Sequence, residues 1–95
     1  MDTSSNEFVA LGQNIRKARR ALNISQEELS FRSGLHRTYL SDVERGARNP
    51  SFASLLAVAR GLGSTVSELT RDIGGPPNSP EQSASRIPHV SPAND

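Results

Sequence analysis

The stretch Ile24–Gly46 reads ISQEELSFRSGLHRTYLSDVERG, and it predicts two short helices joined by a tight turn. Its segment Ser25–Glu28 has the S-x-x-E form of a capping box, in which the serine caps the first amides of a helix and the glutamate returns to the serine amide. We expect this helix to run to Ser33. Gly34 then allows the positive φ that a tight turn requires, and Leu35 can pack in the angle between the two helices.

The second helix of the pair is expected over Arg37–Arg45, with Gly46 as its C-terminal cap. At helical spacing, Leu40, Val43 and Glu44 share one side. The opposite side is polar and consists of Arg37, Thr38, Ser41 and Arg45. The major groove of duplex DNA, about 12 Å wide, admits one such helix with its N-terminal residues at the base edges. The pattern therefore predicts a helix-turn-helix whose second helix enters the major groove.

A longer helix is predicted before this pair. Apolar residues recur there at steps of three and four, which is the stripe of an amphipathic helix. They are Phe8, Leu11, Ile15, Ala18 and Leu22. Asn23 tolerates the left-handed conformation that ends a helix, and we expect the stripe to stop there.

Two further helices are predicted after the pair. Ser51, behind Asn49 and Pro50, can cap a fourth helix. Its apolar stripe consists of Phe52, Leu55, Leu56, Ala59 and Leu62, and Gly61 and Gly63 end it. The segment Thr65–Glu68 repeats the capping-box form and begins a short fifth helix, whose apolar pair is Val66 and Leu69.

The five patterns indicate one all-α domain over residues 7–72, followed by a tail over residues 73–95. Five of the six prolines lie in this tail, and its few apolar residues show no period. Such a composition is typical of a disordered segment that cannot form a core. The alternative is a partner-binding segment around Ile87–Val90.

Composition excludes several classes of protein. The chain of 95 residues has no cysteine, which rules out a disulfide framework and thiolate zinc sites and favours a reducing cytoplasm. No apolar segment approaches the roughly 20 residues that span a bilayer, so we expect a soluble protein without a membrane partner. His36 and His89 are isolated, and we expect neither a metal site nor a cofactor. The adjacent Glu27 and Glu28 would point in different directions on a helix, so no catalytic carboxylate pair is recognised and no enzymatic activity is expected.

Positive charge is concentrated in the predicted domain. The whole chain has a formal net charge of +1, whereas residues 7–72 contain ten Lys and Arg against seven Asp and Glu, a net of +3. All but one of the ten are arginine, whose planar guanidinium suits phosphate and guanine. Arg16, Lys17 and Arg20 could contact phosphate, but a charge cluster on a helix is usually a solvated face, which is the interpretation we favour.

Over Leu11–Leu69 the sequence closely resembles the Cro/lambda-repressor-like group, also called the XRE family. The segments that carry the resemblance are IRKAR at 15–19, ISQEEL at 24–29, GL at 34–35, YLSDVERG at 39–46 and NPS at 49–51. Within that family, RTYLS at 37–41 looks most like the controller proteins of restriction–modification systems. The resemblance implies a compact lambda-repressor-like fold. It also implies a cytoplasmic, nucleoid-associated transcriptional regulator that binds a palindromic operator in double-stranded DNA as a homodimer.

The resemblance also implies which residues contact DNA. Ser25 and Gln26 begin the first helix of the pair, where Gln26 would touch a backbone phosphate. Arg37 and Thr38 fall where the family recognises base edges, and an arginine bound to guanine O6 and N7 contributes about 1–3 kcal/mol of discrimination. Tyr39 and Ser41 would add phosphate or base contacts, and His36 could approach a phosphate. Arg45, Arg48 and Asn49 flank the far end of the helix, where the family often contacts the backbone. Tyr39 could equally be a core residue, and His36 replaces the serine, aspartate or asparagine usual at this cap.

By the same resemblance, Arg19 and Glu44 form a partly buried bridge between the first and third helices, and a homodimer forms through Val66, Leu69 and Ile73. One function of a different class stays open. The chain could be an antitoxin-like or other protein-interaction module, in which the tail 74–95 binds a partner protein and DNA binding is secondary.

Overall fold

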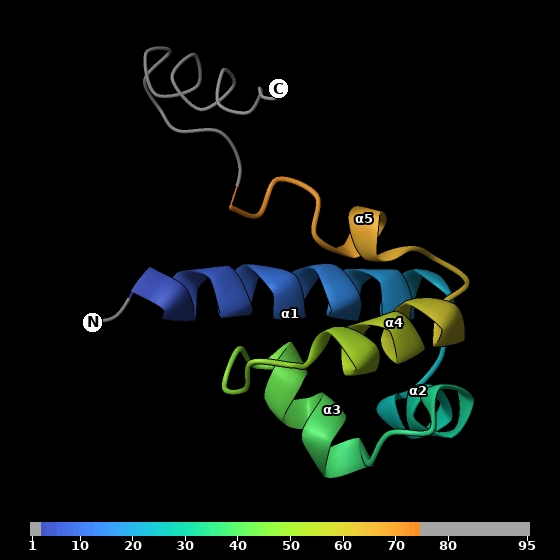
Figure 1. Ribbon diagram of the computed structural model, residues 1–95. Coiled ribbons are helices and arrows are strands. Elements are labelled where there is room, and N and C mark those ends of the chain that lie inside the picture. Colours follow the sequence, from blue (N-terminus) through green and yellow to red (C-terminus); the bar gives the residue numbers. More distant parts are fainter. Residues whose placement is uncertain (1–2, 75–95) are drawn as a thin grey trace, which may run out of the picture.

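The computed structural model describes residues 3–74, with side chains from Glu7 onward, and this part is all-helical (Figure 1). The helices are α1 Thr3–Ala21, α2 Gln26–Ser33, α3 Arg37–Glu44, α4 Phe52–Gly61 and α5 Val66–Leu69. All five expected helices are confirmed, and α3 ends at Glu44, one residue earlier than expected, with Arg45 as its C-cap. Within the described range no helix has the length and apolar character needed to cross a membrane.

The helix ends follow the local signals of the sequence. The side chains of Ser25, Ser51 and Thr65 each accept a hydrogen bond from the amide three residues later, at 3.0–3.1 Å. Asn23 and Gly34 adopt the left-handed conformation, with φ of +61° and +76°. The other half of the first capping box was wrong, because the Glu28 carboxylate accepts a hydrogen bond from Arg32 Nε at 2.9 Å. A basic residue four positions further along the helix therefore takes the place of the Ser25 amide.

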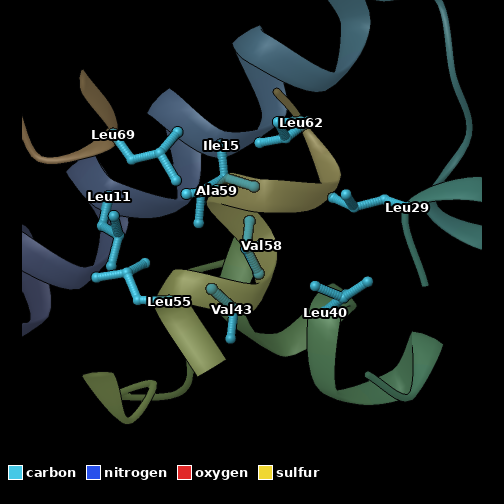
Figure 2. Packing of buried hydrophobic residues seen from close by; sticks show 10 residues of the cluster. All are labelled: Leu11, Ile15, Leu29, Leu40, Val43, Leu55, Val58, Ala59, Leu62 and Leu69. Atoms are coloured by element: carbon cyan, nitrogen blue, oxygen red, sulfur yellow. The ribbon is translucent and has the colours of Figure 1, made fainter. Parts of the chain in front are cut away.

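The helices surround one hydrophobic core, shown in Figure 2. Its buried members are Leu11, Ile15, Leu29, Leu40, Val43, Leu55, Val58, Ala59, Leu62 and Leu69. In space, α1 packs on α3 and α5, while α2 packs on α3 and α4. Each helix of the central pair is thus supported by a different neighbour.

The predicted apolar stripe of α4 was wrong at one end. Phe52 is 67% exposed, whereas Val58, which the predicted stripe omitted, is 1% exposed. The buried positions Leu55, Val58, Ala59 and Leu62 define a face that is rotated away from Phe52. On α1, Leu22 at the end of the predicted stripe is likewise 44% exposed, because it lies just beyond the last helical residue.

The predicted tail 73–95 lies outside the described residues apart from Ile73 and Gly74. Ile73 is partly buried and packs against the core, so the ordered contacts continue one residue past the expected boundary at Asp72.

Helices α1 and α3 approach each other closely at Gly12, which lies on α1. A Cβ atom at Gly12 would lie 2.4 Å from the carbonyl oxygen of Glu44 and 2.5 Å from that of Val43. Gly46, with φ of +78°, packs against Val9 of α1 in the same way, where a Cβ would lie 2.5 Å from Val9 Cγ2. The position of α3 on α1 therefore depends on two glycines.

We predict that Gly12→Ala lowers the free energy of unfolding by about 2 kcal/mol, because an overpacking cost of about 3 kcal/mol exceeds the gain of about 1 kcal/mol in helix propensity. Chemical denaturation measures the change. Gly63→Ala is the control, since Gly63 has φ of +65° with no atom near the added Cβ and so reports backbone strain alone. A Gly12→Ala variant as stable as the wild type would contradict the close approach.

Candidate nucleic-acid interface

The turn between α2 and α3 is stabilised by hydrogen bonds that join the last residues of α2 to the turn residues Gly34 and Leu35. The Gly34 amide donates to the Ser30 carbonyl at 2.8 Å, and the Leu35 amide donates to Ser33 Oγ at 3.3 Å. The Ser30 hydroxyl donates to the Leu35 carbonyl, and the Leu35 side chain packs against the core. These contacts set the angle at which α3 leaves the turn.

The two faces of α3 differ as the spacing predicted. Leu40, Val43 and Glu44 are at most 3% exposed. Arg37 and Thr38, in the first turn, are exposed, as is His36 before them. His36 is the N-cap of α3, but its side chain makes no capping hydrogen bond, so the imidazole remains available to an external group.

A buried carboxylate lies where α1, α2 and α3 meet. The Glu44 side chain has no exposed surface. Arg19 Nε donates to its Oε2 at 2.7 Å and Arg19 Nη2 to its Oε1 at 3.0 Å. Gln26 Nε2 and Arg16 Nε donate to Oε1 at 3.1 Å and 3.4 Å. The predicted bridge between Arg19 and Glu44 is therefore confirmed, and it belongs to a larger cluster.

The cluster keeps the carboxylate ionised. Burial acts to raise the pKa of Glu44, but hydrogen bonds from Arg19 and Gln26, the charge of Arg19 and the hydrogen bond from Arg16 together outweigh it. The net result is a pKa below the ordinary value for glutamate. The hydrogen bond to Glu44 also raises the pKa of Arg19, so both partners stay charged.

Two members of this cluster went unrecognised in the sequence. Arg16 was assigned to a solvated face, yet its Nε lies within hydrogen-bonding distance of Glu44 while 39% of the side chain stays exposed. Gln26 was expected only at a phosphate, and the structure holds its amide nitrogen on Glu44. Arg19 Nη1 also donates to the carbonyl of Ile24 at 3.0 Å, two residues before Gln26, but this contact too is visible only in the folded structure.

A second polar cluster lies at the C-terminal end of α3. Arg48 Cζ lies 4.9 Å from the centre of the Tyr39 ring, and Arg48 Nη2 lies 3.8 Å from Asp42 Oδ2. Arg45 donates to the other oxygen of Asp42. Tyr39 is half-buried and packs against the core, so its ring supports both the core and the guanidinium of Arg48.

The ten expected contact residues lie at the start of α2, along α3 and in the loop after it. The exposed members are Ser25, His36, Arg37, Thr38, Arg45, Arg48 and Asn49. The partly buried members are Gln26, Tyr39 and Ser41. Between residues 3 and 74 the structure brings no three potential metal ligands of the His, Cys, Asp or Glu type together.

We predict that Glu44→Gln lowers the free energy of unfolding at neutral pH by about 3–5 kcal/mol, because it leaves Arg19, whose side chain is only 11% exposed, without its counter-ion. The stabilisation by the Glu44 carboxylate is fully present above its unfolded pKa, about 4.3, and is lost as the pH falls through the lower folded value.

Denaturant unfolding between neutral pH and pH 3 measures both effects. The wild type should lose stability below about pH 4.3 more steeply than Glu44→Gln, which has no carboxylate to protonate there. Glu68→Gln, at an exposed carboxylate on α5, should follow the wild type. Parallel pH profiles for the wild type and Glu44→Gln would show that Glu44 is not stabilised in this way.

Comparisons with known proteins agree with the geometry of the helix pair. The helix-turn-helix family profile matches residues 15–69. The control protein C.SmaI of Serratia marcescens is 44% identical over 59 residues, which cover 62% of this chain and 70% of that protein. The control protein C.BamHI of Bacillus amyloliquefaciens is 40% identical over 67 residues, covering 70% and 83%.

Solved structures show the same fold. The restriction-modification controller protein C.AhdI from Aeromonas hydrophila has a TM-score of 0.66 and 44% identity, covering 67% of this chain and 97% of that one. The wild-type controller protein C.Esp1396I has a TM-score of 0.60 and 34% identity, covering 62% and 77%. These matches confirm the lambda-repressor-like arrangement expected from the sequence. The chain therefore belongs to the helix-turn-helix family of DNA-binding transcriptional regulators, within its XRE group.

Proposed function

We propose that this protein binds a palindromic operator as a homodimer, with α3 in the major groove, and acts as a controller of linked restriction and modification genes. The observation that carries the proposal is the exposed first turn of α3, Arg37 and Thr38, on a helix whose opposite side is fully buried. The names of C.SmaI, C.BamHI and C.AhdI as control or controller proteins support the biological role.

Arg37 is the residue best suited to sequence recognition. Its guanidinium is exposed at the N-terminal end of α3, which is the end that meets base edges when such a helix enters the groove. An arginine in that place donates two hydrogen bonds to one guanine, a pattern that no other base offers. Thr38, its neighbour, has a hydroxyl for hydrogen bonding and a methyl group for contact with thymine.

Most of the other expected residues would position the protein on the backbone, and Tyr39 and Ser41 would contact either phosphates or bases. Ser25 and Gln26 lie at the first turn of α2, next to the Glu44 cluster, and would meet one phosphate strand. Arg45, Arg48 and Asn49 would meet phosphates at the far end of α3, and His36, Tyr39 and Ser41 lie between the two ends. Contacts of this kind set orientation and register but do not distinguish sequences.

Dimerisation supplies the second half of the recognition surface. One domain presents few base-contacting side chains, and two-fold dimers place two such helices about 34 Å apart. Of the residues expected at the seam, Val66 and Ile73 are partly buried, while Leu69 is 2% exposed and packs inside the core. We place the contact at Val66 and Ile73, with Leu69 supporting them from beneath.

The proposed role is binding of operator DNA without catalysis. The protein would act in the cytoplasm at the nucleoid, where operator DNA is found. The matched relatives are regulators, which supports a function based on recognition alone.

We predict that selection from a random duplex library at moderate salt enriches a palindrome, and that Arg37→Ala weakens its guanine preference by about 1–3 kcal/mol per half-site. The reason is the loss of the bidentate hydrogen bonds that only guanine accepts. Enrichment followed by sequencing measures the preference, and denaturation confirms that the variant is folded. Arg60→Ala, at an exposed arginine of α4, is the matched control and should keep the wild-type preference.

Two results would count against the proposal. If folded wild-type protein enriches no sequence at any salt, it does not recognise DNA directly. If Arg37→Ala and Arg60→Ala retain the same preference as the wild type, α3 does not recognise bases through Arg37.

We predict that the wild type sediments as a dimer and that Val66→Asp shifts it to a monomer, because a buried unpaired carboxylate disfavours association. Sedimentation velocity over a range of concentrations measures the change, and circular dichroism confirms retained helices. Ser67→Asp, at the adjacent exposed position, adds the same charge and should remain dimeric. A dimer that tolerates Val66→Asp would move the seam away from α5.

A further inference from the structure

We infer that Asp42 is an internal counter-ion of the DNA-binding surface, which holds Arg45 and Arg48 and thereby limits the electrostatic affinity of the protein for duplex DNA. The inference rests on the proposed function, because it concerns two of the proposed phosphate-binding arginines. It assigns a role to an acidic residue within a surface otherwise suited to an anionic ligand.

The two oxygens of Asp42 face two different arginines. Oδ1 accepts a hydrogen bond from Arg45 Nη2, and Oδ2 lies 3.8 Å from Arg48 Nη2. The chain reverses directly after α3, where the Ala47 amide donates to the Asp42 carbonyl at 2.9 Å. Because of this turn, Arg48 lies on the side of α3 that carries Asp42. The single carboxylate of Asp42 therefore interacts with the guanidinium groups of both Arg45 and Arg48.

Tyr39 completes the arrangement around Arg48. The guanidinium of Arg48 lies over the Tyr39 ring, 4.9 Å from its centre, and also near Asp42 Oδ2. It therefore makes a cation–π contact with Tyr39 and an ion pair with Asp42. Both arginines remain accessible, since the side chains of Arg45 and Arg48 are 58% and 51% exposed, whereas Asp42 is only 25% exposed. A phosphate that approaches the two arginines therefore meets a net charge of +1 instead of +2, because Asp42 neutralises one positive charge.

This arrangement makes the phosphate compete with Asp42. Ion pairs between exposed side chains are weak, so the competition is worth about two- to fivefold in affinity for each arginine. It acts on duplexes of every sequence alike, because phosphates are the same throughout DNA. Asp42 thus reduces the contribution of sequence-independent phosphate contacts to the binding free energy. Base contacts by the first turn of α3 then account for a larger fraction of that free energy.

The test is Asp42→Asn, which keeps the size of the side chain and removes its charge. Binding is measured over a range of salt concentrations, to a fixed duplex without the selected operator and to the operator itself. We expect affinity for the fixed duplex to rise by about two- to fivefold per released arginine. The slope of log affinity against log salt should steepen by about 0.9 for each additional phosphate that the released arginines neutralise.

Two controls separate this role from a general effect of charge. Glu68→Gln removes a carboxylate that pairs with an arginine three residues along the chain, Arg71 Nη2 at 2.8 Å, and should change neither affinity nor slope. In a background of Arg45→Ala and Arg48→Ala, Asp42→Asn should also have no effect, because no arginine remains to be released.

The inference is overturned if Asp42→Asn leaves affinity and slope unchanged, or if it weakens binding, which would make Asp42 a support for the arginines. It is also overturned if Glu68→Gln or the arginine-free background shows the same rise in affinity. These outcomes are distinct from failure of the proposed function, which a wild type that enriches no operator would show.

Discussion

The buried charge of Glu44 is the constraint on which the helix pair depends. A carboxylate without exposed surface is costly unless its hydrogen-bonding capacity is filled, and here the donors come from Arg16 and Arg19 on α1 and Gln26 on α2. Because Glu44 belongs to α3, one side chain holds three helices in a single relative position. The arrangement also requires α1 and α3 to touch through backbone at Gly12, since a larger residue would hold the carboxylate away from its donors.

The helices and their ends were predictable because their signals are local. Capping serines and threonines and left-handed turn residues act within a few residues, and those predicted at Ser25, Ser51, Thr65, Asn23 and Gly34 were found where expected. Which face of a helix is buried depends less on neighbouring residues and more on the packing of other helices against it. On α4 the spacing was compatible with a face that includes Phe52, and only packing against α2 and α5 shows that the face turns toward Val58. Glu28 shows the same limit, because Arg32 competes for its carboxylate.

For the candidate interface, the exposed positions of α3 followed from its periodicity, whereas contacts between its side chains did not. Arg19 and Glu44 were paired through the family resemblance, but the places of Gln26 and Arg16 on the same carboxylate needed the three-dimensional arrangement. Asp42 was overlooked for a related reason. Its two arginines lie beyond the end of the helix, and only the turn at Ala47 brings Arg48 near it.

The stability of α3 comes almost entirely from its inward side. Its N-cap residue His36 makes no capping bond, its first turn has no acidic residue, and its last turn has no basic residue. The helix is held instead by Leu40, Val43 and Glu44 against the rest of the domain. Its outward-facing residues therefore contribute little to the stability of the domain and can be substituted without unfolding it. Under the recognition by α3 proposed above, a few substitutions at these positions would change the preferred DNA sequence, so that binding preference could diverge while the fold is preserved.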